Sequence, residues 1–480
     1  MKPSLSRRLF STIQRSLGAD IEKRLHELQD SQWLSHSELQ QMQWRKLTKL
    51  LHNAYKNVPY YRRTWQEAGI HPSDIRSWDD FKKVPFLTKG QVRENHSEML
   101  SKEIKRMSLH HDSTGGSSGT PLRFVRPQDT KAWFWAAQYR GYGWFGIQLD
   151  DRQGRFYGMP FGLVSGYKAR MIDWVMNRRR ISAFDMRDEQ MRAFAQQMNR
   201  FRPVYLNGYA MAIGRFAEFM SREKNRARYT WIPLKGVVST SEVLTPTYKR
   251  LIEEVFECPV INEYGAAEIG LVAITCPKGG FHVVCENVYL ETIPAIDVEL
   301  PPNVSSGPVE IVITDLHNYA MPFIRYKVGD LLKAAPDERL KCDCGRGSLL
   351  IGSVIGRDNS LVVTPEGKVL SGMVFDYLAR YSLMKESGIR QFVARQDALD
   401  RITYYIVKDD HFSDSTLKYL SDTTRQYLGP SIIIDMKFVS QIPLTNKGKF
   451  MNFSSTLNVN EVLTRICYSK KSDKKPACRD

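Results

Sequence analysis

The sequence predicts an α/β protein with more than one domain, and three observations carry this prediction. The chain has 480 residues, more than a single hydrophobic core usually holds. From about residue 200, short apolar segments alternate with segments of helical spacing, which is typical of parallel βαβ units. Near residue 356 a new series of strand-like and helix-like segments begins, and this indicates a second, smaller α+β domain.

The first 200 residues are mostly helical in pattern. Residues 20–56 place Leu, Gln, Lys and Glu at helical spacing, and we expect "NVPYYRR" (57–63) to interrupt them. Ser77 or Asp79 is expected to cap a short helix further on. Residues 128–146 are rich in aromatic side chains, so they form either a buried helix or the wall of a cleft.

The α/β region is the most regular part of the sequence. Its expected strands are "PVYLNGY", "LKGVVST" and "PVINEYG", and its expected helices are "AIGRFAEFMSREK" and "TPTYKRLIEEVF". After residue 285 the pattern becomes β-rich, which predicts a barrel or meander attached to the α/β core.

The net charge of +17 is compatible with a solvated basic surface or with an anionic partner. Zinc-finger spacing, an RNA-recognition aromatic motif and basic-leucine heptads are all missing from the sequence, so we expect no nucleic-acid partner. The basic stretch "MNRRR" (176–180) is interpreted as a solvated helix face, with contact to an anionic acceptor or a membrane surface as the alternative.

Cysteine usage and the N-terminus bear on location. Seven cysteines without a dense framework favour a reducing compartment, and we expect the cytoplasm. The first 20 residues are basic and lack the continuous apolar core of a signal peptide. They are compatible with an organellar transit segment, an amphipathic surface helix or an ordinary first helix, and we favour the last.

A glycine-rich segment, "STGGSSGTPL" (113–122), precedes the α/β region. Backbone N–H groups in such a turn bind anions, and glycine lets a phosphate approach the backbone. The segment lacks the Lys-Ser/Thr ending of a standard phosphate-binding loop, so a linker or an ordinary turn explains it equally well.

Two carboxylates follow predicted strands. Glu268 in "NEYGAAEIG" is expected at the carboxyl end of a strand, where α/β proteins bind ligands and where it can hold Mg²⁺. Asp330 in "MPFIRYKVGDLL" is expected in a turn after a strand, where it can accept hydrogen bonds from two ribose hydroxyls. A glutamate at an exposed helix start and an aspartate in a hairpin turn are the alternatives.

Two further motifs lie in the second domain. "VIGRDNSLV" (354–362) stands where that domain begins, and "IPLTNKGKF" (442–450) lies near its end. The ammonium group of Lys449 is suited to neutralising a phosphate or a developing charge. Taken alone, Lys449 is more readily a solvated loop lysine.

Together the five motifs resemble one superfamily. Their order is a glycine-rich loop, YGxxE, RYxxGD, GRD and PxTxxGK. This order resembles the adenylate-forming superfamily, and within it the phenylacetate–coenzyme A ligase family with its capsule-biosynthesis-associated relatives. Stretches such as "NVPYYRRTWQEAGI" and "FKKVPFLTKGQVREN" also match, and the resemblance covers residues from about 40 to 455.

The resemblance implies an architecture. It implies a large N-terminal domain (1–355) of αβαβα subdomains with a distorted β-barrel. A small, mobile α+β lid domain (356–465) follows, and the charged tail (466–480) is expected to be disordered. Asn359 stands where a hinge aspartate is usual, and this puts the hinge in doubt.

The resemblance also implies a set of ATP contacts. Tyr264 would lie beside the adenine with Gly265, Glu268 would hold Mg²⁺, and Asp330 would bind the ribose. Arg357 would approach the nucleotide, and Lys449 would be the catalytic lysine. The phosphates would contact the glycine-rich loop, namely Thr114, Gly115, Gly116, Ser117, Ser118, Gly119 and Thr120.

The implied activity is ATP-dependent activation of a carboxylic acid, followed by transfer of the acyl group to coenzyme A or to an amine. The amine would lie, for example, on a sugar of a capsule or O-antigen. A catalytically weak scaffold in polysaccharide assembly is the alternative. The acid would contact residues 133–146, 207–210 and 239–242, whose aromatic side chains indicate an apolar substrate portion or core packing. Peripheral membrane contact stays open, and the sequence does not give the oligomeric state.

A metal site is predicted as well. Cys276, His282, Cys342 and Cys344 would complete a closed tetrahedral zinc site with three thiolates and one imidazole. Relatives in the family carry a structural zinc on a similar pattern. Unrelated reduced cysteines are the alternative, and Cys285 is a competing ligand.

Overall fold

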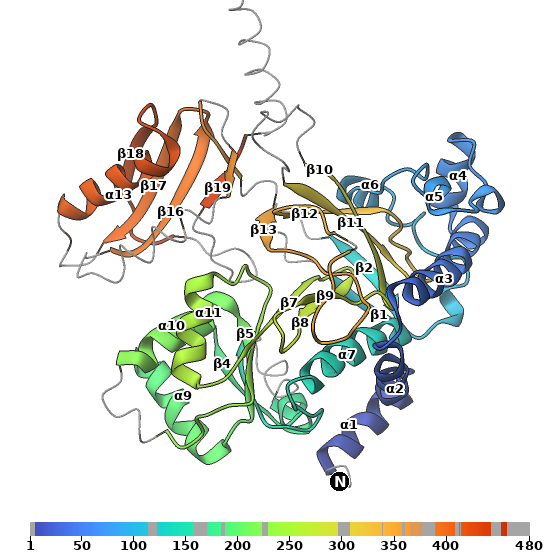
Figure 1. The fold of residues 1–480 in the computed structure, drawn as a ribbon, viewed down its shortest axis with the longest axis horizontal. Coiled ribbons are helices and arrows are strands. Elements are labelled where there is room, and N and C mark those ends of the chain that lie inside the picture. Colours follow the sequence, from blue (N-terminus) through green and yellow to red (C-terminus); the bar gives the residue numbers. More distant parts are fainter. Residues whose placement is uncertain are drawn as a thin grey trace, which may run out of the picture. The chain divides into compact units, whose positions relative to one another are not determined.

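The computed structural model divides the chain into two compact units (Figure 1). Unit 1 comprises Met1–Glu291, Val312–Val328 and Pro336–Gly352, and unit 2 comprises Thr292–Ile311, Gly329–Ala335 and Ser353–Asp480. The residues that the structure describes are 5–113, 122–157, 170–183, 188–222, 229–295, 308–337, 339–357, 361–365, 369–371, 375, 389–408, 412, 414–442 and 453–457.

Unit 1 contains a seven-stranded sheet in the order β4-β3-β5-β6-β7-β8-β9. From β4 to β7 neighbouring strands are parallel, and β8 and β9 are added antiparallel. The strands are β3 Gln153–Tyr157, β4 Arg178–Ser182, β5 Tyr205–Tyr209, β6 Gly236–Thr240, β7 Val260–Ala266, β8 Gly270–Thr275 and β9 Phe281–Val283.

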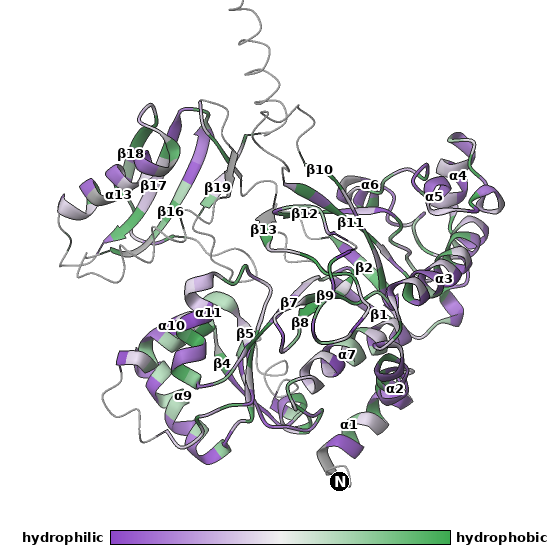
Figure 2. Cartoon of the chain, viewed as in Figure 1, coloured by the Kyte–Doolittle hydropathy of each residue, from purple (hydrophilic) through white to green (hydrophobic). Residues whose placement is uncertain are grey.

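Helices cover both faces of this sheet because its strands alternate their apolar side chains between two clusters. Leu206 and Val237 pack with α9 Asp188–Phe201, α10 Ala210–Arg222 and α11 Pro246–Phe256. Their chain neighbours Tyr205 and Val238 pack on the other face with α2 Ile21–Ser31 and α7 Gln128–Gly143. Apolar and polar bands on α9 and α10 in Figure 2 fit this arrangement. The prediction of parallel βαβ units is confirmed.

Several of the N-terminal helices begin at side-chain caps. Ser35 forms a capping box with Glu38, and this begins a second helix within residues 20–56. Ser77, and not Asp79, caps α5. The helices are α1 Leu5–Ser16, α3 His36–Asn57, α4 Pro59–Glu67, α5 Trp78–Phe81 and α6 Lys89–Glu94, with 3₁₀ turns η1 Pro72–Asp74 and η2 Ile104–Arg106.

"NVPYYRR" does interrupt the helical region, but only at Val58, which separates α3 from α4; α4 begins with Pro59 at its first position, where the missing proline N–H is not needed. One sequence-based assignment was wrong, because "MNRRR" is not a helix face. Its arginines begin β4 at the sheet edge, with Arg178 buried and Arg179 exposed.

The β-rich region after residue 285 forms a four-stranded sheet in the order β10-β11-β12-β13. Its strands are β10 Val288–Pro294, β11 Val309–Asp315, β12 Tyr326–Leu332 and β13 Val354–Arg357. The limits between the two units fall within β10, β11 and β12. Upstream, β1 Leu109–Ser113 and β2 Arg123–Pro127 pair as a separate antiparallel hairpin.

The C-terminal part of unit 2 is an α+β layer, as the sequence predicts. A sheet in the order β18-β17-β16-β19 and helix α13 Asp414–Leu428 share an apolar cluster that includes Phe392 and Leu420. The strands are β14 Leu361–Val363, β15 Val369–Ser371, β16 Ile389–Ala398, β17 Arg401–Lys408, β18 Ile433–Phe438 and β19 Phe453–Ser455. The charged tail lies outside the described residues.

Close contact between α10 and α11 gives a stability prediction. A Cβ atom at Gly214 would lie 2.4 Å from the ring of Tyr248, so Gly214→Ala must push the helices apart. We expect the free energy of unfolding in urea to fall by about 1–3 kcal/mol. Gly143→Ala, where nothing lies within 4 Å, is the matched control and should leave stability equal or slightly higher. Equal stability of the two variants would contradict the packing described.

Candidate active site

Glu268 lies in the turn between β7 and β8, at the carboxyl end of a parallel strand, as predicted. Its side chain is buried, and the Tyr326 hydroxyl donates a hydrogen bond to its Oε1 at 2.8 Å. A Cβ atom at Gly265 would lie 2.3 Å from the carbonyl oxygen of Gly270, so the tight pairing of β7 and β8 requires glycine there. Tyr264 is buried on the same strand.

A buried arginine lies beneath this turn. Arg126 on β2 donates to the carbonyl oxygen of Ala267, the residue before Glu268. Burial lowers the pKa of Arg126, while the negative charges of Asp315, Asp112 and Glu268 oppose that shift. The turn is therefore held from two sides, by Arg126 and by Tyr326.

Asp315, at the end of β11, is the second buried charge near Arg126. Burial raises its pKa to about 6, against the hydrogen bond that the His317 N–H donates to Oδ1 at 2.9 Å. Its Oδ2 has no hydrogen-bond partner among the residues that the structure describes. The sequence interpretation missed both Arg126 and Asp315. The one available signal was an aspartate directly after the apolar run "VEIVIT".

Asp330 and Arg357, predicted as nucleotide contacts, lie opposite each other in the antiparallel pair β12 and β13. The prediction that Asp330 follows a strand was wrong, because β12 continues through it to Leu332. Gly329 has a φ of +80°, a conformation that glycine adopts readily, and the strand continues through this position rather than ending.

The glycine-rich loop Thr114–Thr120, Asn359 and Lys449 lie outside the described residues. The strands on either side of the loop are described. Ser113 on β1 is paired with Arg123 on β2, so the chain leaves and re-enters the hairpin at one place.

A polar cluster surrounds Glu263, next to Tyr264 on β7. Tyr142 donates to Glu263 Oε1 at 2.7 Å, Gln138 donates to the same atom at 3.2 Å, and Asn207 donates to the Tyr142 hydroxyl at 3.3 Å. Burial raises the pKa of Glu263 to about 7, although hydrogen bonds from Tyr142, Gln138 and Thr240 oppose this. Segments 133–146, 207–210 and 239–242 were predicted to contact the acid. They come together around the carboxyl group of Glu263, directly or through Tyr142.

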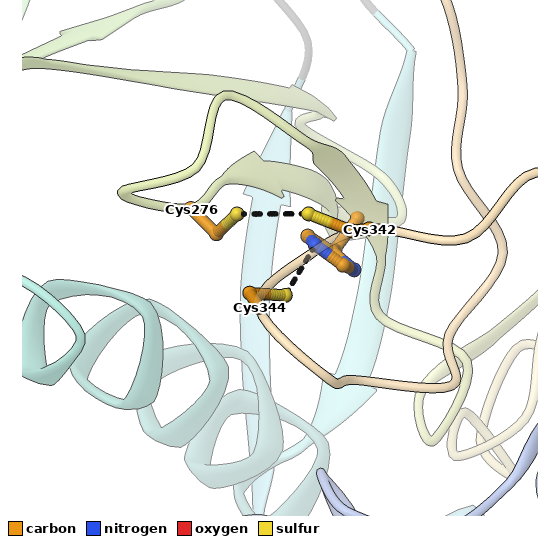
Figure 3. A group of neighbouring side chains, drawn as sticks. Cys276, Cys342 and Cys344 are labelled. Atoms are coloured by element: carbon orange, nitrogen blue, oxygen red, sulfur yellow. Dashed lines mark hydrogen bonds between the residues drawn. The ribbon is translucent and has the colours of Figure 1, made fainter.

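The four predicted metal ligands also come together. The ligand atoms of Cys276, His282, Cys342 and Cys344 all lie within 4.8 Å of one another. Figure 3 shows the three cysteines turned toward a common point, and the Cys276 and Cys342 sulfurs are 3.5 Å apart. Tetrahedral zinc with bonds of about 2.3 Å holds its thiolate sulfurs roughly 3.8 Å apart, so the group fits such an ion.

Two details around this group also fit a metal. Ser348 Oγ lies 2.9 Å from His282 Nδ1, an outer contact that orients the ring and leaves Nε2 facing the cysteines. A Cβ atom at Gly280 would lie 2.7 Å from the Cys342 sulfur, so only glycine leaves the space at the centre of the group. Cys285 is buried and is not part of the group.

Comparison with known proteins places the chain among relatives. A family model described as the CapK C-terminal domain matches residues 362–454. Protein CapK of Staphylococcus aureus is 24% identical over 437 residues, which cover 89% of this chain and 90% of that protein. A phenylacetate–coenzyme A ligase of Pseudomonas putida is 23% identical over 416 residues, which cover 83% and 90%.

A solved structure shares the fold. The structure of 2-hydroxyisobutyryl-CoA ligase in the postadenylation state, in complex with 2-HIB-AMP, matches with a TM-score of 0.67 at 20% identity. The match covers 92% of this chain and 94% of that chain. The fold is therefore that of an adenylate-forming coenzyme A ligase.

The fold and the relatives together define the class of protein, an adenylate-forming ligase. Within that class, the chain is similar to phenylacetate–coenzyme A ligases and to CapK.

The raised pKa of Glu263 predicts a pH-dependent stability difference. Between its ordinary pKa of 4.5 and about 7, the folded chain binds more protons at this site than the unfolded chain, so stability declines as the pH rises through that window. Glu263→Gln cannot ionise. Its free energy of unfolding relative to wild type should therefore rise by about 1–3 kcal/mol from about pH 5 to about pH 8.

Denaturation curves at several pH values measure this difference. Glu189→Gln, at an exposed position of α9, is the control and should change this difference with pH far less, because water screens an exposed carboxylate. An equally small change for Glu263→Gln would mean that Glu263 is not buried as described.

Proposed function

We propose that the chain uses ATP to convert a carboxylic acid into an acyl-adenylate and then transfers the acyl group to coenzyme A or to an amine. The observation that carries the proposal is the fixed position of Glu268. It is a buried carboxylate at the carboxyl end of β7, held by Tyr326 and, through Ala267, by Arg126. Ligands of α/β sheets bind at this end of the strands.

In the first step, an oxygen of the substrate carboxylate attacks the α-phosphorus of ATP. The bond from that phosphorus to the bridging oxygen breaks, and pyrophosphate leaves with the electron pair. Mg²⁺ would neutralise the triphosphate charge and would be held by Glu268, whose carboxylate is the hard oxygen ligand that this ion prefers. Lys449 would contact the carboxylate and the α-phosphate and stabilise the charge of the transition state.

Asp330 and Arg357 would hold the nucleoside side of ATP. Their opposed positions on β12 and β13 support this assignment, because residues directly across an antiparallel pair have Cα atoms about 4.5–5.5 Å apart. Tyr264 and Gly265 on β7 would lie beside the adenine, and the loop Thr114–Thr120 would hold the phosphates.

In the second step, the thiol of coenzyme A or an amine attacks the acyl carbonyl carbon, AMP leaves, and the nucleophile releases its proton. We place the reaction in the cytoplasm and include an amino sugar of a capsule or O-antigen among the acceptors. A C-terminal lid that turns between the two steps would move Lys449 away from the acyl group.

The acid itself would carry a hydrogen-bond donor. Glu263, Tyr142 and Asn207 are polar and buried where the acid segments meet. Glu263 already accepts hydrogen bonds from Tyr142 and Gln138, but a carboxyl group has further acceptor positions, and a hydroxyl or amino group on the acyl chain would be a matching donor. The purely apolar or aromatic portion expected from the sequence is therefore less well matched than a polar one.

Carboxylate-dependent exchange of pyrophosphate into ATP tests the proposed function. We expect exchange with an acid from a panel of matched hydroxylated, aminated and unsubstituted acids, with the substituted members preferred. Lys449→Ala should lower the exchange rate by about 100-fold or more, because the carboxylate and the α-phosphate lose their shared cation. Lys437→Ala, at an exposed lysine of β18, is the control and should keep the wild-type rate.

Failure of every acid in the panel, together with no binding of ATP, would overturn the proposed function in favour of a scaffold. Equal rates for Lys449→Ala and wild type would remove Lys449 from the mechanism.

We further propose that Cys276, His282, Cys342 and Cys344 hold a structural zinc ion. The proximity of their ligand atoms and the space at Gly280 support this. The ion would join the β8–β9 turn to the segment 342–344 without taking part in the reaction.

Metal analysis of the purified protein tests the zinc proposal. Wild type should contain one equivalent of zinc, and Cys342→Ser should lose it and unfold at a lower temperature, because three ligands bind zinc more weakly than four. Cys285→Ser is the control and should keep its zinc. A stable wild type without zinc would contradict the proposal.

A further inference from the structure

Exposed apolar side chains are found mainly on two short helices of unit 1. Of the large apolar side chains that are exposed in the described part of the chain, six belong to α1 with its following turn or to the helical residues 170–175, and their exposed fractions range from 37% to 66%. We call this set the apolar face; its residues are Leu9, Ile13, Leu17, Met171, Ile172 and Trp174.

Three of these side chains lie on α1 or in the turn that follows it, and we call Leu9, Ile13 and Leu17 the apolar stripe. Among the α1 residues whose burial is described, Phe10 is buried, and its ring stacks on Trp135 of α7 with centroids 5.2 Å apart. At about 100° per residue, Leu9 and Ile13 lie roughly 100° and 60° around the helix from Phe10, both on the same side of it. The apolar stripe therefore lies beside the packing residue of α1 and is exposed.

The second part of the face is fixed in place by ion pairs. Asp173 is buried, and its carboxylate accepts hydrogen bonds from Arg178 and, at 2.9 Å, from Arg180 on β4. This holds residues 170–175 against the sheet edge while Met171 and Trp174, the most exposed members of the face, remain in solvent. Met171 and Trp174 are therefore exposed on a helix that the ion pairs of Asp173 hold in place.

The two parts are attached to one apolar cluster. Val175, the last residue of the second helix, and Met176 after it pack against the same cluster that contains Phe10 and that receives α2 and α7. In Figure 1, α1 leads into α2, which runs beside α7. The stripe of α1 and the helix 170–175 are therefore attached to one support.

The charges on the two helices of the face are mainly positive. α1 has three arginines and no acidic residue; Arg8 and Arg15 are exposed on it, and Arg15 pairs with Asp20 just after the helix at 3.1 Å. Arg170 and Arg179, which flank the second helix, are exposed as well. Both helices thus combine exposed apolar side chains with arginines, and the second also exposes Trp174. This composition is typical of helices that lie in the plane of a membrane interface.

We propose that the apolar face binds the surface of an anionic lipid bilayer. The six apolar side chains would enter the boundary between headgroups and acyl chains, and the flanking arginines would contact anionic headgroups. The protein would lie on the membrane and not cross it, since no helix among the described residues is long and apolar enough to span one.

An anionic membrane fits the face better than a second copy of the chain. A two-fold interface brings the same patch of both copies together, so the arginines that flank the face would approach one another. Like charges in such an interface repel, whereas anionic headgroups neutralise each of them.

Flotation with lipid vesicles tests the proposal. The full chain should float with vesicles of phosphatidylcholine and phosphatidylglycerol, bind pure phosphatidylcholine less, and detach as salt is raised. Leu9→Ser/Ile13→Ser and, independently, Met171→Ser/Trp174→Ser should each lower the partition coefficient by about tenfold or more.

The control variant is Leu340→Ser/Ile433→Ser, which removes two apolar side chains that are equally exposed elsewhere, with Ile433 at 40% exposure like Ile13. It should bind vesicles as wild type does, and all variants should keep the wild-type melting temperature. Absence of wild-type binding to anionic vesicles, or equal binding by all variants, would overturn the proposal. So would a wild-type dimer in sedimentation that Leu9→Ser/Ile13→Ser converts to monomer.

Discussion

The hydrogen bond from Tyr326 to Glu268 is the contact on which the candidate active site depends. A buried carboxylate is costly unless donors reach it, and Tyr326 supplies one from β12 while Arg126 holds the preceding carbonyl from β2. The turn after β7 is thereby fixed by strands from two other parts of unit 1. Because β12 also bears Asp330, one strand carries both the support of Glu268 and the proposed ribose ligand.

Two buried carboxyl groups lie next to residues of the candidate site, Asp315 near Arg126 and Glu263 beside Tyr264. Asp315 and Glu263 are both fully enclosed, and burial raises the pKa of each. Such groups lower stability, and a fold that retains them does so where ligands need polar partners. The polar surroundings of Glu263 distinguish the proposed acid site from a purely aromatic pocket, since Tyr142 and Asn207 present hydroxyl and amide groups and not only rings.

The fold could be predicted from the sequence where the local apolar pattern matches the element that the tertiary structure contains. The strands and helices between residues 205 and 266 were predicted because their apolar residues alternate with the period of each element. The position of Glu268 followed from the same alternation. The four residues of the proposed zinc site were predicted because two of them are close in sequence and the others form a C-x-C pair.

Other features have no local signal. Three consecutive arginines conceal the alternation of β4, in which Arg178 is buried by its ion pair with Asp173. Gly329 before Asp330 suggests a turn, although the strand continues through a left-handed glycine. Arg126 and Asp315 lie far apart in the sequence, so their electrostatic interaction becomes visible only when β2 and β11 are placed in space.

Binding of ATP with and without Mg²⁺ to wild type and to Glu268→Gln tests whether Glu268 holds the Mg²⁺ ion of the nucleotide. The glutamine side chain in that variant keeps the shape and the acceptor for Tyr326 but loses the charge that Mg²⁺ needs. Titration calorimetry should show that Mg²⁺ strengthens ATP binding to wild type, and that Glu268→Gln removes this increment while its affinity for metal-free ATP stays unchanged. An increment of the same size in both proteins would contradict the role of Glu268 as the Mg²⁺ ligand, and so would no binding of ATP to wild type.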